Sequence, residues 1–146
     1  MIKTRDTLSI ALAMAAWPGS FCNAQPNGAY PTFPQGSAPV TISTTGTVGA
    51  ISVVLPGAVN RLTSLCGFVI TSGGTTTAVV GVATVTGVVS GTMSFEYVAV
   101  SSGQGLLGVA FPQCLPAATA SAGISVTSPA GGTGTVGAVT AWGYQQ

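Results

Sequence analysis

Residues 75–100 constrain the fold most, because their pattern predicts two β-strands joined by a tight loop. In the second half, apolar and polar side chains alternate, as expected for a strand with one buried face. The apolar set is Met93, Phe95, Tyr97 and Ala99, and the other set is Thr92, Ser94, Glu96 and Val98. The first half is rich in Val and Thr, which favour strands, and glycines flank the loop at 87–91. We expect a long antiparallel hairpin in the middle of an all-β domain.

Short strands separated by turn signals continue on both sides of this hairpin. They are expected at 40–44, 49–55, 65–71, 106–111, 124–127 and 135–144. Pro112 should end the strand at 106–111, leaving 113–122 irregular. About eight strands without a helical pattern predict an antiparallel β-sandwich, jelly-roll-like or, alternatively, immunoglobulin-like. Residues 78–85 are apolar on both faces, which indicates a buried central strand or a face covered by another subunit.

Residues 1–24 have the features of a secretory signal peptide. Lys3 and Arg5 precede a short apolar run, and Cys22-Asn23-Ala24 supplies small residues at a cleavage site. The apolar run is shorter than the ~20 residues that a membrane-spanning helix needs. The alternative is an uncleaved N-terminal arm that docks on a partner, and both interpretations stay open.

A proline-rich linker or arm, residues 25–39, precedes the β-domain at 40–146. Repeated prolines prevent a helix and favour an extended chain. Tyr30 and Phe33 lie in this segment, and Phe21 lies shortly before it. These aromatic side chains either anchor the arm in pockets of a neighbouring subunit or fold back onto their own domain.

Charged residues are almost absent. They make up 3% of the 146 residues, against roughly 25% in an average soluble domain, and they are Lys3, Arg5, Asp6, Arg61 and Glu96. Nucleic-acid binding needs clustered Lys and Arg, so no nucleic-acid partner is expected. So little charge also leaves a monomer without the usual protection against association. This favours a surface covered by other subunits over a monomer kept in solution by Ser, Thr, Asn and Gln.

The side chains of general acid–base catalysis are also nearly missing. The chain has no His, and its side-chain carboxylates are Asp6 and Glu96. A Ser–His–Asp triad is therefore impossible within one chain, and zinc, calcium and phosphate-loop sites lack their ligands or motifs. We expect no enzyme activity, no catalytic residue, no cofactor, no metal site and no small-molecule substrate.

Two of the three cysteines, Cys66 and Cys114, lie within the β-domain. A bridge between them would close a loop of about 49 residues and add about 4 kcal/mol in the chain-entropy model. The alternative is a pair of buried thiols. Cys22, if retained, is free to pair between chains.

Three phrases of the sequence carry a resemblance to a known group of proteins. They are Leu65-Cys66-Gly67-Phe68, then Phe111-Pro112-Gln113-Cys114-Leu115-Pro116-Ala117, and the ending Ala141-Trp142-Gly143-Tyr144-Gln145. The stretch from about Gly46 to Gln146 resembles small β-rich proteins of tailed-phage virions. The resemblance implies a capsid decoration or cement protein, or a related head or tail component, with a jelly-roll-like fold. The signal-like start departs from this group, whose members mostly assemble in the cytoplasm.

The leading hypothesis is a structural virion protein on the capsid surface, whose partners are the major capsid protein and copies of itself. One alternative is an exported surface or periplasmic β-sandwich, adhesin-like or pilus-like, cleaved near Ala24. Another is a carbohydrate-binding module with Trp142, Tyr97 or Tyr144 as stacking platforms, although these residues alternate as core residues do.

Overall fold

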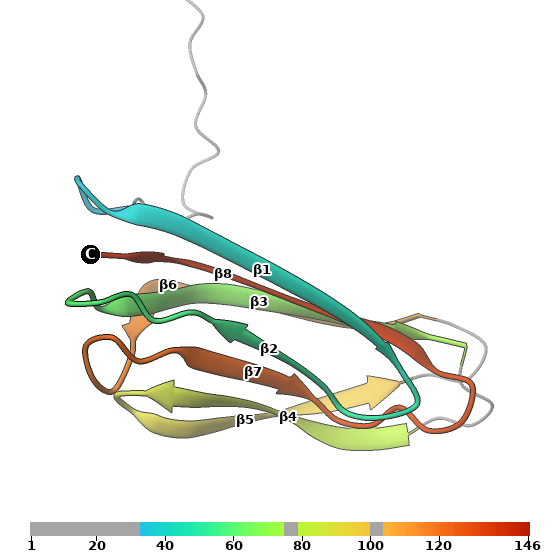
Figure 1. Cartoon of the computed structure of the whole chain (residues 1–146). Coiled ribbons are helices and arrows are strands. Elements are labelled where there is room, and N and C mark those ends of the chain that lie inside the picture. Colours follow the sequence, from blue (N-terminus) through green and yellow to red (C-terminus); the bar gives the residue numbers. More distant parts are fainter. Residues whose placement is uncertain (1–32, 75–78, 100–103) are drawn as a thin grey trace, which may run out of the picture.

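The described part of the chain is built entirely from β-strands. The computed structural model describes residues 33–74, 79–99 and 104–146, and no helix occurs in these ranges (Figure 1). The strands are β1 (Ala38–Thr47), β2 (Ile51–Leu55), β3 (Thr63–Gly73), β4 (Val79–Val88), β5 (Gly91–Ala99), β6 (Gln104–Pro116), β7 (Ile124–Ser128) and β8 (Val136–Gln145). The all-β prediction is confirmed, and β1 begins inside the predicted linker.

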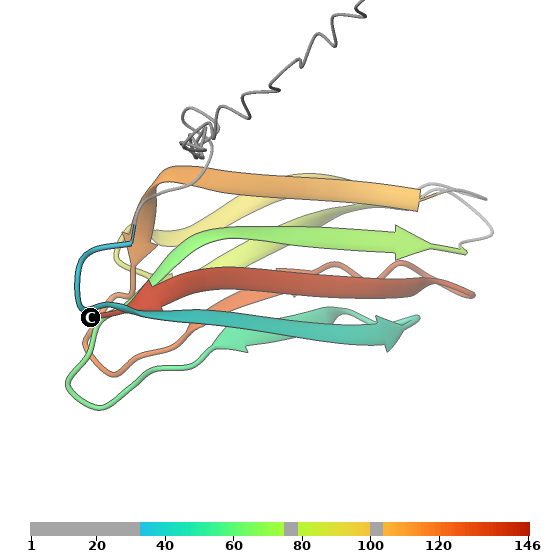
Figure 2. The same ribbon diagram turned by 90° about the horizontal axis from the view of Figure 1, so that it is seen from above.

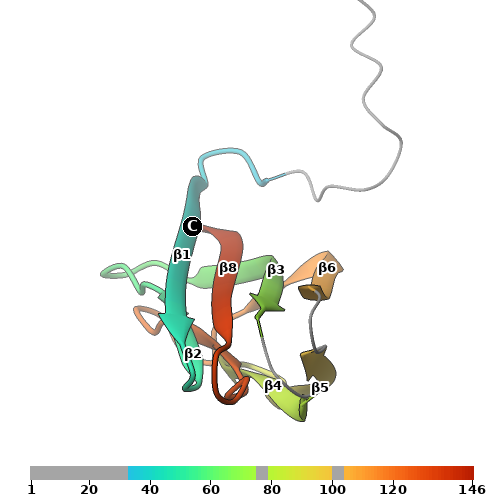
Figure 3. The same cartoon turned by 90° about the vertical axis from the view of Figure 1, so that its right-hand side faces the viewer.

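The strands form two four-stranded sheets in the order β1-β8-β3-β6 and β2-β7-β4-β5. Figures 1 and 3 show the sheets stacked as a sandwich, and Figure 2 looks down on the first one. β1 pairs with β8, β2 with β7, β3 with β6 and β4 with β5, always antiparallel. The first four strands therefore pair in order with the last four, as in one long hairpin that folds over on itself. Pairing of β8 with β3 completes the first sheet, and pairing of β7 with β4 completes the second.

This strand order is that of a jelly roll. An immunoglobulin-like domain instead places its first, second, fifth and fourth strands in one sheet, so that alternative was wrong. The predicted central hairpin is the tip of the rolled chain. The sequence predicts this hairpin in the middle of the domain, but its second strand, β5, lies at the edge of a sheet.

The core lies between the sheets and follows the alternation of the strands. On β2, Ile51, Val53 and Leu55 point inward, and on β5 the predicted alternation is confirmed. Phe68 on β3 is fully buried and its ring centroid lies 5.3 Å from that of Phe95 on the opposite sheet. Burial of one such side chain stabilises the fold by roughly 1.5–3 kcal/mol.

β6 does not end at Pro112, as we had expected, but continues to Pro116. The register of β6 against β3 shifts between two pairs, Ala110 with Gly67 and Leu115 with Leu65. Pro112 lies inside this irregular stretch of an edge strand, where no ladder hydrogen bond from its nitrogen is needed.

On β8 the large aromatic side chains point away from the core, and smaller residues point toward it. Gly137, Val139, Ala141 and Gly143 are the buried set, while Trp142 and Tyr144 lie on the outer face and are half-buried. The small inward residues make room for the other sheet. A Cβ atom on Gly137 would lie 2.9 Å from Cδ1 of Ile51.

Candidate interaction surfaces

Arg61 and Glu96 are the charged side chains of the described residues, and both are exposed. Arg61 lies in the connection between β2 and β3, and Glu96 points outward from β5. Figure 3 places that connection and β5 on opposite sides of the sandwich. Across these same residues, no cluster of His, Cys, Asp and Glu suits a metal ion.

Three exposed valines form an apolar patch on the outer face of the second sheet. This valine patch consists of Val80 and Val82 on β4 and Val98 on β5, with exposed fractions of 63%, 54% and 40%. Val80 is directly opposite Val98 in the strand register, and Val82 is directly opposite Glu96. The patch therefore lies next to a carboxylate on the edge strand β5. Val80 and Val82 are the outward apolar positions of the stretch that the sequence indicated to be apolar on both faces.

Hydroxyl groups cover much of the rest of this outer face, where Val54 on β2, 49% exposed, is a further apolar side chain. Ser52 on β2 hydrogen-bonds Ser125 and Thr127 on β7, at 3.0 and 2.9 Å. Thr84 on β4 lies opposite both Thr127 and Ser94 in the register. These paired hydroxyls keep that part of the face polar without charge, which leaves the valine patch as a separate apolar area.

The β2–β3 connection carries a second exposed apolar side chain beside a charge. Val59 is 82% exposed and lies two residues before Arg61. Backbone hydrogen bonds hold this loop in place: Arg61 N–H donates to Ala58 O at 3.0 Å, and Ser121 N–H donates to Arg61 O at 2.8 Å. Asn60 N–H donates to the Ser121 hydroxyl at 3.0 Å. Val59 and Arg61 therefore project from an ordered support.

Of the three predicted arm anchors, Phe33 lies among the described residues, whereas Phe21 and Tyr30 lie outside them. Phe33 makes an edge-to-face contact with Tyr144, with 5.7 Å between ring centroids, and is 45% exposed. A turn fixes the chain here, because Ser37 N–H donates to Pro34 O at 3.1 Å. Phe33 thus folds onto its own domain.

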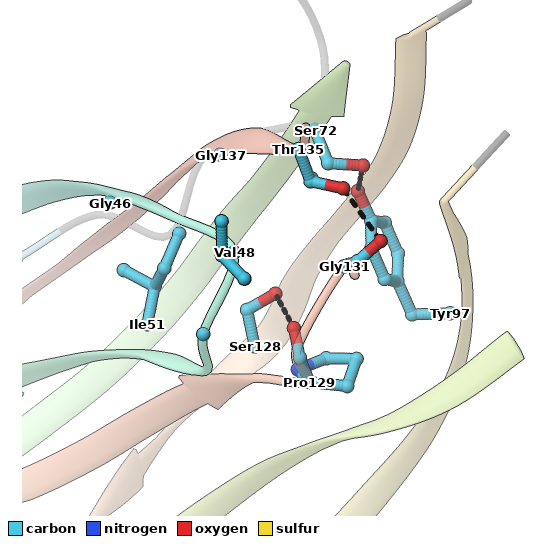
Figure 4. A pocket seen from close by; sticks show the side chains of 11 residues that line it. Gly46, Val48, Ile51, Ser72, Tyr97, Ser128, Pro129, Gly131, Thr135 and Gly137 are labelled. Atoms are coloured by element: carbon cyan, nitrogen blue, oxygen red, sulfur yellow. Dashed lines mark hydrogen bonds between the residues drawn. The ribbon is translucent and has the colours of Figure 1, made fainter. Parts of the chain in front are cut away.

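The three proposed sugar-stacking residues are not brought together. Tyr97 is buried, and its hydroxyl donates to the Ser72 hydroxyl at 2.5 Å (Figure 4). Trp142 lies against Gly67 on the outer face of the first sheet. Tyr144 lies on that same face under Phe33. Tyr97 therefore cannot serve as a platform, and the other two rings are partly covered by this domain.

The hollows of the described residues include a narrow one and a wider one. The one in Figure 4, beside Tyr97 and Thr135, holds only about 10 Å³, the volume of a single water-sized sphere. Thr135 hydroxyl donates to Gly131 O there at 2.6 Å. The other is a depression of about 370 Å³ on the outer face of the first sheet. Its lining is Thr45, Thr71, Ser72, Gly73, Gln104, Val136, Gly137 and Ala138, none of which titrates near neutral pH.

Cys66 and Cys114 are joined in the structure, with their sulfur atoms 2.06 Å apart. They link the neighbouring strands β3 and β6 at the place where the register between these strands shifts. Cys66 is fully buried. The bridge therefore ties together the part of the first sheet with the fewest regular backbone pairs.

Comparisons with known proteins do not assign the chain to a family. No family model matches the chain, and neither the curated proteins nor the solved structures contain a significant match. The described residues contain no helix with the length and apolar character that crossing a membrane requires.

Proposed function

We propose that this chain is a non-enzymatic structural protein of a phage virion, a capsid decoration or cement protein that bridges major capsid subunits. The observation that carries the proposal is the combination of a jelly-roll domain with an almost uncharged surface and an exposed valine patch. Jelly rolls are common in viral capsid domains, although the fold also serves other functions. The resemblance of residues 46–146 to small phage virion proteins supports the same role.

The surface chemistry supports binding to protein and not catalysis. Arg61 and Glu96 lie on opposite sides of the domain, so the described residues bring no acid and base together. Exposed valines and paired hydroxyls bury well against another uncharged surface. The proposed partners are the major capsid protein and further copies of this chain, and the proposed location is the outer surface of the capsid.

Particle stability provides the test of this role. Particles from the native source would be prepared with and without the chain, and release of their nucleic acid would be followed during heating. A cement protein raises the release temperature when the purified chain is added back, because it stabilises only the assembled state. Unchanged release, together with no binding to particles, would contradict the proposal.

A second candidate is an exported surface or periplasmic β-sandwich. The Cys66–Cys114 bridge favours it, because disulfides persist mainly in oxidising compartments. The signal-like residues 1–24 point the same way. The intact mass of the native protein separates the two: a chain beginning at Gln25 supports export, and a chain that retains residues 1–24 supports an arm.

A further inference from the structure

We propose that copies of this chain associate head to tail through two sites on opposite sides of the domain. The β2–β3 connection of one copy, with Val59 and Arg61, docks on the valine patch of the next copy, where Arg61 pairs with the neighbour's Glu96. This inference rests on the proposed function for its biological setting and names the surfaces by which the decoration protein would associate with itself.

Charge complementarity identifies the occupant of the valine patch. Glu96 borders the patch, opposite Val82 and on the edge strand β5, so a partner that covers the valines also lies against a carboxylate. A buried carboxylate needs a cationic partner. Among the described residues Arg61 is the cation, and the β2–β3 connection that carries it lies on the opposite side of the sandwich from β5, which carries Glu96 (Figure 3). A second copy supplies it.

Each of the two sites also combines its charge with exposed valine. Val59 is the most exposed of the large apolar side chains described, at 82%, and it lies two residues from Arg61. Val80, Val82 and Val98 flank Glu96 in the strand register. Docking brings the valines of the two copies together and places one ion pair at their border, which is the usual arrangement of an apolar interface centre with charge at the rim fixing its register.

The loop that carries Arg61 is already ordered in the single chain. Its backbone is held by Ser121, through hydrogen bonds of 2.8 and 3.0 Å. A Cβ atom on Gly57 would lie 2.6 Å from the carbonyl carbon of Ser121, so the two loops pack closely. A preformed loop loses little conformational entropy on binding, which suits it to dock on the flat sheet face.

The placement of the two sites determines the type of assembly. A two-fold dimer uses the same patch on both subunits, but here the patches lie on opposite sides of one domain. Each copy therefore contacts one neighbour through its β2–β3 connection and another through its valine patch. Such heterologous contacts produce closed rings or open arrays.

Charge reversal and charge exchange test the interface in the full-length chain. The variants are Arg61→Glu, Glu96→Lys and the double exchange Arg61→Glu/Glu96→Lys, with light scattering and mass photometry across a concentration series. The control variants Thr41→Glu on β1 and Thr92→Lys on β5 add charge at exposed positions outside both sites. Circular dichroism and thermal melting establish that each variant is folded.

We expect each single reversal to weaken association at least about tenfold, because it places like charges together. The double exchange should restore association, and the two controls should associate like the wild type. Val82→Ser should also weaken association without changing charge. Equal association of all variants, failure of the exchange to rescue, or a monomeric wild type at about 100 μM would overturn the inference.

These outcomes separate this inference from the proposed function. A chain that binds particles as a monomer would contradict head-to-tail association and leave the cement role in place. If the double exchange restores association but the chain never binds particles, the cement role is contradicted and the proposed interface stands.

Discussion

Gly67 is the residue at which the outer face of the first sheet leaves no room for a side chain. It pairs with Trp142 in the register, and a Cβ atom there would overlap Cζ2 of that indole and lie 2.6 Å from the carbonyl oxygen of Val109. Gly67→Ala should therefore lower the free energy of unfolding by about 1–3 kcal/mol, as overpacking does. Urea denaturation followed by circular dichroism measures this change.

Gly108→Ala is the matched control for this prediction. Gly108 lies on the same face of the same sheet, and a Cβ atom there would meet only Cγ2 of Val69, at 3.9 Å. Its substitution should leave stability within about 0.5 kcal/mol of the wild type. Equal effects of the two substitutions would contradict the close packing of Trp142 on Gly67.

The hydrogen bond between Tyr97 and Ser72 crosses the interior between the two sheets. Tyr97→Phe should lower the free energy of unfolding by about 0.5–1.5 kcal/mol, because a buried hydroxyl loses its partner. A double-mutant cycle with Ser72→Ala isolates the pair. Additive effects of the two substitutions would mean that the hydroxyls do not stabilise each other.

At the level of elements, the disulfide joins β3 to β6 across a sequence separation of 48 residues. Reduction should lower the free energy of unfolding by up to about 4 kcal/mol, since the unfolded chain gains freedom. The measurement compares oxidised and reduced protein in a Cys22→Ser background, which prevents thiol exchange. Cys66→Ala/Cys114→Ala should match the reduced protein, and an unchanged unfolding midpoint after reduction would argue against the bridge.

Local alternation predicted the strands better than it predicted their positions in the sheets. Met93, Phe95 and Tyr97 face inward as expected, because the period of two is a property of the strand itself. The placement of β5 at an edge depends on which distant strands pair, and no local pattern specifies that. Pro112 does not end β6, contrary to the prediction, because the register is irregular at this point of an edge strand and no backbone hydrogen bond from residue 112 is needed.

At the level of the whole molecule, the sequence predicted a nearly uncharged domain with an outward apolar strand face, and the valine patch corresponds to it. It did not predict that Arg61 and Glu96 lie on opposite sides, since this follows from the rolled topology. The only signal for this site in the sequence was Val59, two residues before Arg61 in the connection between two expected strands. Such a signal gains meaning only when the loop is seen to be exposed.

Co-sedimentation with particles tests the central claim most directly. Material from the native source would be separated on a density gradient, and the chain and the major capsid protein quantified in every fraction by mass spectrometry. The account predicts a constant ratio of the two proteins across the particle fractions, retained after a salt wash because the contacts are mainly apolar. Recovery of the chain only in particle-free fractions would contradict it.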